Sequence, residues 1–339
     1  MSLFKSLEAL CTLDSPSGRE GAVREYILGE IAEKNTKTDA LGNLIVSKKG
    51  EKRAKSRLLI DAHMDEVGFI ITNILPSGML KFTTIGGIDA SVIIARRVRF
   101  LSGISGVVGC SPIHLLSADE GKKPPKTESL YIDIGASSKE EAEKYVSLGD
   151  MAVFESVFEQ LGEHKIKAKA LDDRIGCAVL LQMIKSETEY DMTFSFTVQE
   201  EVGLRGATVA ANAINPDFAI VVEATTAADY DGIAPENQVC KLGAGAVLSF
   251  MDGGTLYDKE LYDLAMKTAA EKGIAVQPKT AVAGGNNAGA IHKSGGGIRT
   301  LAVSVPCRYI HSGASVCDKR DIAAVADLVR EMASKLAKL

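Results

Sequence analysis

The sequence predicts an α/β protein that carries a smaller β-rich unit inserted into it. Apolar strand-like segments alternate with amphipathic helical segments near both ends of the chain, which is typical of α/β domains. Between residues 69 and 164 the pattern changes to short alternating runs separated by Gly, Pro and charged clusters, as in all-β units. We therefore expect a main domain formed by residues 1–68 and 165–339, with residues 69–164 as the insert.

The composition is that of an ordinary globular protein. Of the 339 residues, 46% are hydrophobic and 24% are charged, which does not indicate disorder. There are 39 Lys and Arg against 44 Asp and Glu, and this net charge of -5 argues against a nucleic-acid-binding surface. Because no apolar run reaches the ~18 residues of a membrane span and no signal peptide is recognisable, we expect a cytoplasmic protein. The six scattered cysteines suit reduced thiols.

The first elements are helical. Residues 3–12 have the apolar spacing of a short amphipathic helix. Ser17 and Glu20 fit a capping box, with Ser17 as N-cap of a second helix that runs to about Lys34. A turn and a strand follow over residues 39–46.

A second strand, over residues 57–62, ends in His63-Met64-Asp65. His63 is a candidate metal ligand, and Asp65, two positions along an extended chain, would orient its ring. The alternative is a packed or surface histidine, which is common after a strand. Asp61 lies inside the apolar run, so we expect a hydrogen-bonded structural role for it.

The insert is predicted to hold five strands and one polar helix. His114 and His164 have no acidic or histidine neighbours at ligand spacing, so we assign neither to a site. The expected strands cover residues 69–73, 97–100, 106–110, 130–134 and 151–154, and the helix covers residues 138–146.

Acidic side chains recur at the element ends of the second half. Asp172 and Asp173 precede a helix, where an aspartate can cap the helix, but capping hardly explains both. The buried strand over residues 192–198 is followed by Glu200 and Glu201. Successive side chains point different ways, so one can hold a metal while the other faces a reacting water. The alternative is two solvated glutamates.

The remaining segments complete the α/β pattern. A strand from residue 217 delivers Glu223 at its end, and His311 follows a strand over residues 298–305. Helices are predicted over residues 258–272 and 318–336, and a Gly/Asn turn lies at residues 284–292.

Side chains at the carboxyl ends of parallel strands meet at one edge of the sheet, so these residues are expected to converge. Two imidazoles and several carboxylates suit Zn²⁺, Co²⁺ or Mn²⁺. If Asp172 bridges two such ions, three carboxylates and one hydroxide balance the four positive charges. Metal coordination lowers the pKa of water to about 7, which makes that hydroxide available. Glu200 would then act as general base and later as general acid.

At this point a family resemblance becomes specific. The segments 62–68, 171–174, 199–203 and 310–313 together resemble the M42 family of metallo-aminopeptidases, in order along nearly the whole chain. The resemblance implies an α/β/α sandwich with a mixed sheet, of the zinc-exopeptidase type, and a PDZ-like insert that serves dimerisation and assembly. Many members form a hollow tetrahedral dodecamer, so a homo-oligomer is expected here.

The resemblance also implies roles for the site residues. His63, Asp172 and Glu223 would bind one metal, and Asp172, Glu201 and His311 would bind the other. Glu200 would be the base, Asp65 would orient His63, and a non-proline cis peptide would follow Asp172. The expected substrates are short peptides with a free N-terminus, and the expected cofactors are two ions per chain, of Zn²⁺, Co²⁺ or Mn²⁺.

One departure from the family pattern concerns specificity. Relatives often have Gly-Gly-Thr-Asp where this chain has Gly284-Gly285-Asn286-Asn287, so a charge near the expected substrate pocket is missing. Three rival functions stay open: a related metal-dependent deacylase or dipeptidase, a β-glucan glycosidase that uses paired carboxylates, and a catalytically silent assembly protein.

Overall fold

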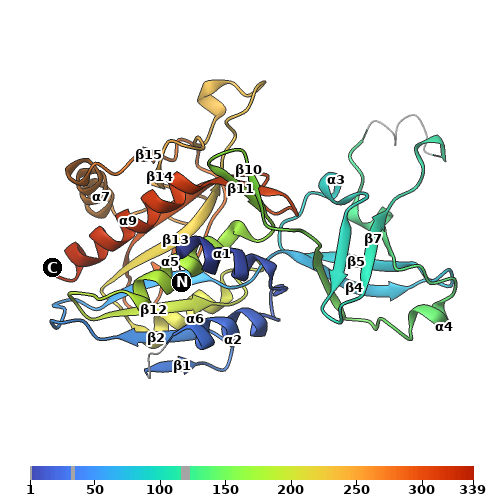
Figure 1. Cartoon of the computed structure of the whole chain (residues 1–339), viewed down its shortest axis with the longest axis horizontal. Helices are drawn as coiled ribbons and strands as arrows, with labels where there is room; N and C mark the ends of the chain where they lie inside the picture. The colour runs from blue at the N-terminus through green and yellow to red at the C-terminus, as the bar shows by residue number, and fades with distance from the viewer. Residues whose placement is uncertain (1, 32–34, 116–122) are drawn as a thin grey trace.

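The computed structural model describes residues 2–31, 35–115 and 123–339. Figure 1 shows a large α/β body at the left and a smaller β-barrel at the right, joined by a few connecting segments. Among the described residues, the structure contains no helix that is both long enough and apolar enough to cross a membrane.

The body is built on one mixed sheet. Its main path runs β1-β2-β12-β3-β13-β16-β17-β11-β10, and β14 joins at β16 and carries β15. The strands are β1 (Thr36–Thr38), β2 (Leu44–Lys48), β3 (Leu58–His63), β10 (Glu159–Leu161), β11 (Lys165–Ala168), β12 (Met192–Thr197), β13 (Phe218–Thr226), β14 (Ala246–Leu248), β15 (Val276–Pro278), β16 (Arg299–Arg308) and β17 (Ser315–Asp318).

Helices cover both faces of this sheet, because the central strands are apolar on both sides. Ile60 of β3 packs in the larger core with the helices of one face, whereas its neighbour Leu59 packs against the other face with Ala207. One face carries α1 (Leu3–Thr12), α5 (Leu171–Lys185), α7 (Lys259–Lys272) and α9 (Lys319–Leu336), and the other carries α6 (Arg205–Ile214) and α8 (Ala288–Ile291). A further helix, α2 (Gly21–Glu30), adds Val23 and Ile27 to the larger core.

The centre of the sheet is parallel. Strands β12, β3, β13 and β16 pair parallel to one another, whereas β2 and β17 pair antiparallel with β12 and β16. The register places Thr197 opposite His63 and Val221 opposite Asp61. The carboxyl ends of β3, β12 and β13 therefore lie at one edge, where the sequence predicted a site.

The barrel has its own core. Phe69 makes edge contacts with Phe82 and Phe154, at ring-centroid distances of 5.4 and 5.2 Å. Its six strands close in the order β4-β5-β8-β7-β6-β9. They are β4 (Gly68–Ile74), β5 (Leu80–Ile85), β6 (Arg97–Phe100), β7 (Ser105–Gly109), β8 (Tyr131–Asp133) and β9 (Met151–Phe154), accompanied by the short helices α3 (Ala90–Ile93) and α4 (Lys139–Ala142).

The structure confirms the mixed α/β fold, and a PDZ-like arrangement of the insert stays a prediction. The division of the chain at residues 68/69 and 164/165 also stays a prediction. Within residues 69–164, the prediction missed the strands β5 and β10 and the short helix α3, and the polar helix expected over residues 138–146 is shortened to α4.

The predicted start of the second helix was wrong. The helix begins at Gly21, and the Ser17 hydroxyl donates a hydrogen bond to Asp65 Oδ2 at 2.6 Å instead of capping it. The backbone is extended at Ile31, so the helix ends at Glu30, and the predicted end near Lys34 lies outside the described residues.

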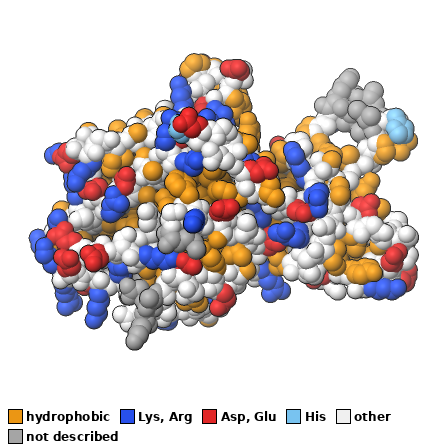
Figure 2. Space-filling view, in the orientation of Figure 1, with side chains coloured by type: hydrophobic (Ala, Val, Ile, Leu, Met, Phe, Trp, Pro, Cys, Tyr) orange, Lys and Arg blue, Asp and Glu red, His pale blue; other side chains and the backbone are white. Residues whose placement is uncertain are grey.

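On the face shown in Figure 2, acidic and basic side chains are interspersed over the body and the barrel.

Candidate metal centre

The predicted ligands come together at the carboxyl edge of the sheet. His63 is the last residue of β3, Glu200 and Glu201 follow β12, and Glu223 lies in β13. All four side chains are buried or nearly so, with at most 11% of their surface exposed. The parallel register holds these strand ends side by side, so the local strand-to-acid pattern becomes one cluster.

Asp172 lies between two imidazoles. Its Oδ1 is 3.4 Å from His63 Nε2, and its Oδ2 is 3.3 Å from His311 Nε2. Each of its carboxylate oxygens therefore faces a different histidine, which is the arrangement that a carboxylate shared by two cations needs.

Each imidazole also faces a second carboxylate. His63 Nε2 is 3.7 Å from Glu223 Oε2, and His311 Nε2 is 3.2 Å from Glu201 Oε2. Two sets of possible ligand atoms lie within 4.8 Å of one another: those of His63, Asp173 and Glu223, and those of His63, Asp172 and Glu201.

Asp65 holds several parts of this cluster. Its Oδ1 is 3.3 Å from His63 Nδ1 and accepts the Glu200 N–H at 3.0 Å. Its Oδ2 accepts the Glu201 N–H at 3.1 Å and the Ser17 hydroxyl. One fully buried carboxylate thus fixes both an imidazole and the backbone of the two glutamates.

Glu200 stands apart from the ligand sets. Its Oε2 is 4.0 Å from His63 Nε2, and its side chain is 11% exposed. Burial raises the pKa of Glu200 to about 7, with the charges of Asp172 and Asp65 adding to the effect and the histidines opposing it. A carboxyl with a pKa near neutrality suits proton transfer.

The electrostatics of the cluster fit a bound cation. Burial raises the pKa of Glu201 and Glu223, and nearby carboxylates raise it further. Burial also opposes ionisation of Asp172, but the nearby imidazoles of His311 and His63 outweigh it and hold the pKa of Asp172 below its usual range.

Two buried oxygens of the cluster, Asp172 Oδ1 and Glu223 Oε1, accept no hydrogen bond from the described residues. Buried carboxylate oxygens without donors are costly unless a cation binds them. The nitrogen and oxygen donor set suits borderline divalent metals such as Zn²⁺.

Asp173 has a structural role beside Asp172. Its Oδ1 accepts the Gly176 N–H at 2.9 Å, and its Oδ2 accepts the His63 N–H at 3.3 Å. Its carboxylate thus caps the regular part of α5, as expected for one of the two aspartates. The peptide bond between Asp172 and Asp173 is cis, as the resemblance implied.

The two asparagines that depart from the family pattern are turned into the fold. Asn287 Nδ2 donates to Asp61 Oδ2 and to Thr197 Oγ1, both at 2.8 Å. Asn286 donates to the Tyr257 hydroxyl at 3.0 Å. Asp61 also accepts a hydrogen bond from the Ser195 hydroxyl, so its predicted structural role agrees with the contacts.

The sequence reading missed a buried ionic network behind the cluster. Glu66 lies between the two cationic residues of the segment that carries Asp172: Lys169 Nζ is 2.6 Å from Glu66 Oε1, and Arg174 is 3.3 Å from the same oxygen. All three side chains are almost fully buried. The only trace of this network in the sequence is the acid Glu66 next to Asp65 and, about 100 residues later, a cation on each side of Asp172.

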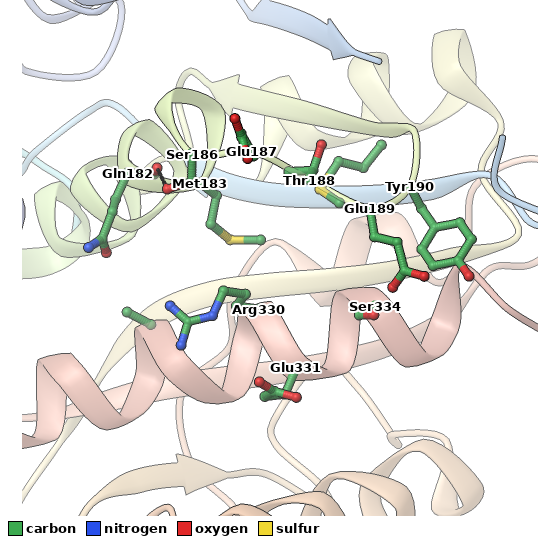
Figure 3. Close-up of a pocket in the computed structure, with 12 residues that line it drawn as sticks. Gln182, Met183, Ser186, Glu187, Thr188, Glu189, Tyr190, Arg330, Glu331 and Ser334 are labelled. Carbon is green, nitrogen blue, oxygen red and sulfur yellow. Dashed lines mark hydrogen bonds between the residues drawn. The ribbon is translucent and has the colours of Figure 1, made fainter. Parts of the chain in front are cut away.

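A separate cavity lies away from the metal centre. Figure 3 shows it between the C-terminal end of α5, the loop that follows and α9, with Met183, Tyr190 and Arg330 among its lining residues and a volume of about 250 Å³. Asp172 is at the opposite end of α5, about 20 Å away at about 1.5 Å per residue. None of the predicted site residues lines this cavity, so it does not belong to the metal centre.

Comparison with known proteins agrees with this geometry. The family model described as M42 glutamyl aminopeptidase matches residues 42–328. The chain belongs to the M42 peptidase family. It is therefore a peptide-hydrolysing enzyme, and membership implies divalent metal ions.

Three relatives illustrate how much of the chain the similarity covers. A lysyl aminopeptidase of Pyrococcus furiosus is 34% identical over 322 residues, which is 91% of this chain and 89% of the relative. An aminopeptidase from the archaeon Desulfurococcus kamchatkensis superposes with a TM-score of 0.92 at 33% identity, covering 97% of this chain and 93% of that one. The TET peptidase of Pyrococcus horikoshii, which can assemble into a tetrahedron or a large octahedral shell, gives a TM-score of 0.86 at 35% identity, covering 98% and 99%.

Proposed function

We propose that this M42 peptidase is a dinuclear metal-dependent aminopeptidase that removes N-terminal residues from short peptides. The observation that carries the proposal is the position of Asp172, whose two oxygens lie 3.4 and 3.3 Å from the Nε2 atoms of His63 and His311. In a glycosidase with two carboxylates, neither imidazole would have a function.

The ligands divide into two sets. His63 and Glu223 would hold one ion, His311 and Glu201 would hold the other, and Asp172 would be shared. Two divalent ions carry four positive charges, which three carboxylates and one hydroxide balance. A buried cluster near neutrality avoids a large desolvation cost.

When bound, the ions would polarise the scissile carbonyl and supply a nucleophile by lowering the pKa of water to about 7. We assign Glu200 to neither ligand set, so its carboxylate would be free to take the proton from the nucleophile and return it to the leaving amine. Asp65 acts through other groups, because it orients His63 and fixes the backbone N–H groups of Glu200 and Glu201. The free amino group of a substrate would bind one metal and nearby carboxylates.

A single substitution tests the role of Glu200. Glu200→Gln keeps the shape of the side chain, so we expect two bound ions per chain and at least a 100-fold loss of kcat. The matched control is Glu236→Gln at an exposed position, which should leave both metal content and kcat unchanged. Retained turnover in Glu200→Gln would rule out the proposed base.

A substrate panel separates the rival functions. Protein stripped with chelator and resupplied with Zn²⁺, Co²⁺ or Mn²⁺ should cleave aminoacyl-p-nitroanilides and leave N-acetylated analogues intact. Removal of the acetyl group from the acetylated analogues would indicate a deacylase, and cleavage of dipeptides alone would indicate a dipeptidase. Chelator-insensitive hydrolysis of a soluble β-glucan would indicate a glycosidase. The metal that restores the highest kcat would identify the preferred ion.

We further propose that the chain forms a homo-oligomer, in which dimers assemble to a dodecamer through the barrel. The shell-forming peptidase of Pyrococcus horikoshii, similar over nearly the whole chain, supports this proposal. We also propose that residues 1–68 and 165–339 form one discontinuous catalytic domain. The insert would be PDZ-like, and the protein would be cytoplasmic.

A further inference from the structure

The two candidate imidazole ligands are held by different parts of the molecule. His63 Nδ1 lies 3.1 Å from the main-chain oxygen of Asp65, two residues along the same segment of the body. His311 Nδ1 lies 2.8 Å from the main-chain oxygen of Gly87, in the loop between β5 and α3 of the barrel. Figure 1 shows α3 on the side of the barrel that faces the body. Because a carbonyl oxygen only accepts, this contact places the proton on His311 Nδ1 and leaves Nε2 free for a metal.

The same barrel loop also touches Glu201, the other predicted ligand of that ion. Gly86 has a φ of +79°, and a Cβ added there would lie 2.8 Å from Val67 Cγ1 and 3.2 Å from Glu201 Cβ. Both the backbone conformation and the close approach require glycine. The barrel loop thus packs directly behind the Glu201 side chain.

The turn that carries His311 has two more contacts with the chain at the end of β9. The Ser156 hydroxyl donates to the Gly313 carbonyl oxygen at 2.6 Å, and a Cβ at Gly313 would lie 3.2 Å from Phe154 Cβ. Phe154 and His311 line one small cavity of about 10 Å³, together with Asp172 and Glu201. A space of that size holds about one water molecule, so the barrel and these ligands are close-packed.

The His63 side of the centre is held by the body. The His63 main chain contacts Asp173 and Cys177 at the start of α5, and its ring contacts Asp65. His63 is 1% exposed at its side chain, whereas His311 is 31% exposed. His63 is therefore anchored within the body, whereas His311 and Glu201 are contacted by the barrel as well.

We propose that the barrel loop at Gly86 and Gly87 positions the ligands of one metal only, the ion held by His311 and Glu201. This inference rests on the proposed dinuclear function. The barrel then controls occupancy of the second metal site, and any partner or assembly contact that shifts the barrel changes that occupancy without disturbing the His63 site.

A pair of glycine substitutions in the barrel tests the proposal. Gly86→Ala introduces a Cβ against Val67 and Glu201, whereas Gly135→Ala introduces one at a φ of +81° with no atom within 4 Å. The two positions have nearly the same φ, so their comparison separates the contact with Val67 and Glu201 from the penalty of a positive φ. Metal-free protein would be titrated with Co²⁺, and binding would be followed by calorimetry and by the visible absorption of the ion.

We expect wild-type protein and Gly135→Ala to bind two ions per chain with the same two affinities. In Gly86→Ala the first affinity should be unchanged and the second should fall by about 10- to 100-fold, the usual effect of disturbing a group that supports a metal ligand. An unchanged second affinity, or an equal loss at both sites, would overturn the inference. Wild-type protein that binds fewer than two ions would instead overturn the proposed function and the inference with it.

A second variant keeps the test decisive if Gly86→Ala does not fold. Ser156→Ala removes only the hydrogen bond to the Gly313 carbonyl and introduces no strain. We expect a severalfold weaker second affinity, an unchanged first affinity and a normal circular dichroism spectrum. If Ser156→Ala weakens the first site and leaves the second unchanged, the assignment of the barrel contact to the His311 ion is wrong.

Discussion

The carboxylate of Asp65 connects three parts of the candidate metal centre. It contacts the His63 ring, and it accepts the backbone N–H groups of Glu200 and Glu201 and the Ser17 hydroxyl. Burial tends to raise the pKa of Asp65, but its contacts with His63 and Ser17 outweigh burial and lower that pKa. The sequence reading assigned Asp65 only to His63, because the other three contacts join segments that are distant in the chain.

Replacing Asp65 with asparagine should therefore weaken metal binding. Asp65→Asn keeps the size of the side chain but loses one acceptor oxygen, so either the ring or the backbone contact is lost. We expect metal affinity to fall by about 10- to 100-fold, measured by competition with a fluorescent chelator. The control is Asp150→Asn in the barrel, whose carboxylate also accepts a backbone N–H, that of Ser147 at 2.8 Å. Equal affinities in the two variants would contradict the role of Asp65.

A second residue-scale prediction concerns Asn287, which donates to the buried Asp61 carboxylate at 2.8 Å. Burial raises the pKa of Asp61 to about 6, and hydrogen bonds from Ser195 and Asn287 limit the rise. Asn287→Asp would replace the donor by a second carboxyl group and raise the pKa of the pair further. In the folded protein these carboxyl groups have pKa values above the value of about 3.9 that they have in the unfolded chain. The free energy of unfolding therefore falls as the pH rises through the folded-state pKa values.

The variant should thus be less stable than wild type by roughly 1–3 kcal/mol at pH 8, with a smaller deficit at pH 5. Urea unfolding at the two pH values would measure this difference. Asn73→Asp, at an exposed position of β4, should show almost no deficit at either pH. A deficit for Asn287→Asp that is larger at pH 5 than at pH 8 would show that the contact with Asp61 is not the cause.

At the scale of elements, the junction of β11 and α5 is held by charges on both sides of Asp172. Lys169 and Arg174 flank Asp172 in sequence, and both contact Glu66. Lys169 Nζ also lies 2.9 Å from the Leu13 carbonyl oxygen. The network therefore ties the start of α5 to the end of α1 and to the turn after β3, so it fixes where Asp172 enters the metal centre.

Because this network is buried, removing one member should be costly. Lys169→Met leaves the Glu66 carboxylate with one cation fewer, and we expect a loss of about 3–5 kcal/mol in the free energy of unfolding. The same substitution at Lys52, whose pair with Glu189 is solvent-exposed, should cost far less. Chemical denaturation of both variants measures the comparison, and similar losses would mean that the buried network contributes no more than a surface pair.

The elements also show what sequence patterns can predict. The α1 and α9 helices begin and end where the patterns placed them, within one residue, because each has a strong apolar stripe. Asp318 also caps α9 through its side chain. The start of α2 was mispredicted because Ser17 bonds to Asp65 instead of capping the helix. The strand β5 was missed because three of its six residues are Lys or Thr and its burial comes from the closed barrel.

Local sequence patterns are limited in the same way at the candidate metal centre. Acids and histidines at strand ends are local patterns, so their convergence was predictable from the parallel arrangement of the strands. The support of His311 by Gly87 was not, because the two residues are 224 positions apart and the contact depends on how the barrel docks. No local pattern marks a backbone carbonyl as the partner of a histidine.

At the scale of the whole molecule, the barrel is fixed to the body on two sides. Arg99 of β6 donates to both carboxylate oxygens of Asp14, at 2.7 and 2.8 Å, on the side of α1. The loop at Gly87 contacts His311 on the side of the metal centre. A unit with its own apolar core is thus held by polar contacts, and a force applied to the barrel in an assembly would reach the metal centre through the Gly87 contact.

Assembly through the barrel leads to the last prediction. Leu148 and Tyr145, after α4, are 65% and 56% exposed in the single chain, so they are apolar surface that an interface would cover. Twelve chains of 35.9 kDa would give a particle of about 430 kDa, measurable by light scattering after gel filtration. Leu148→Glu should lower that mass, because a charge in an apolar interface loses its hydration. Leu256→Glu, at a body leucine that is 76% exposed, should leave the mass unchanged. If Leu256→Glu dissociates the particle and Leu148→Glu does not, assembly uses the body, and the barrel contact with His311 has to be explained without it.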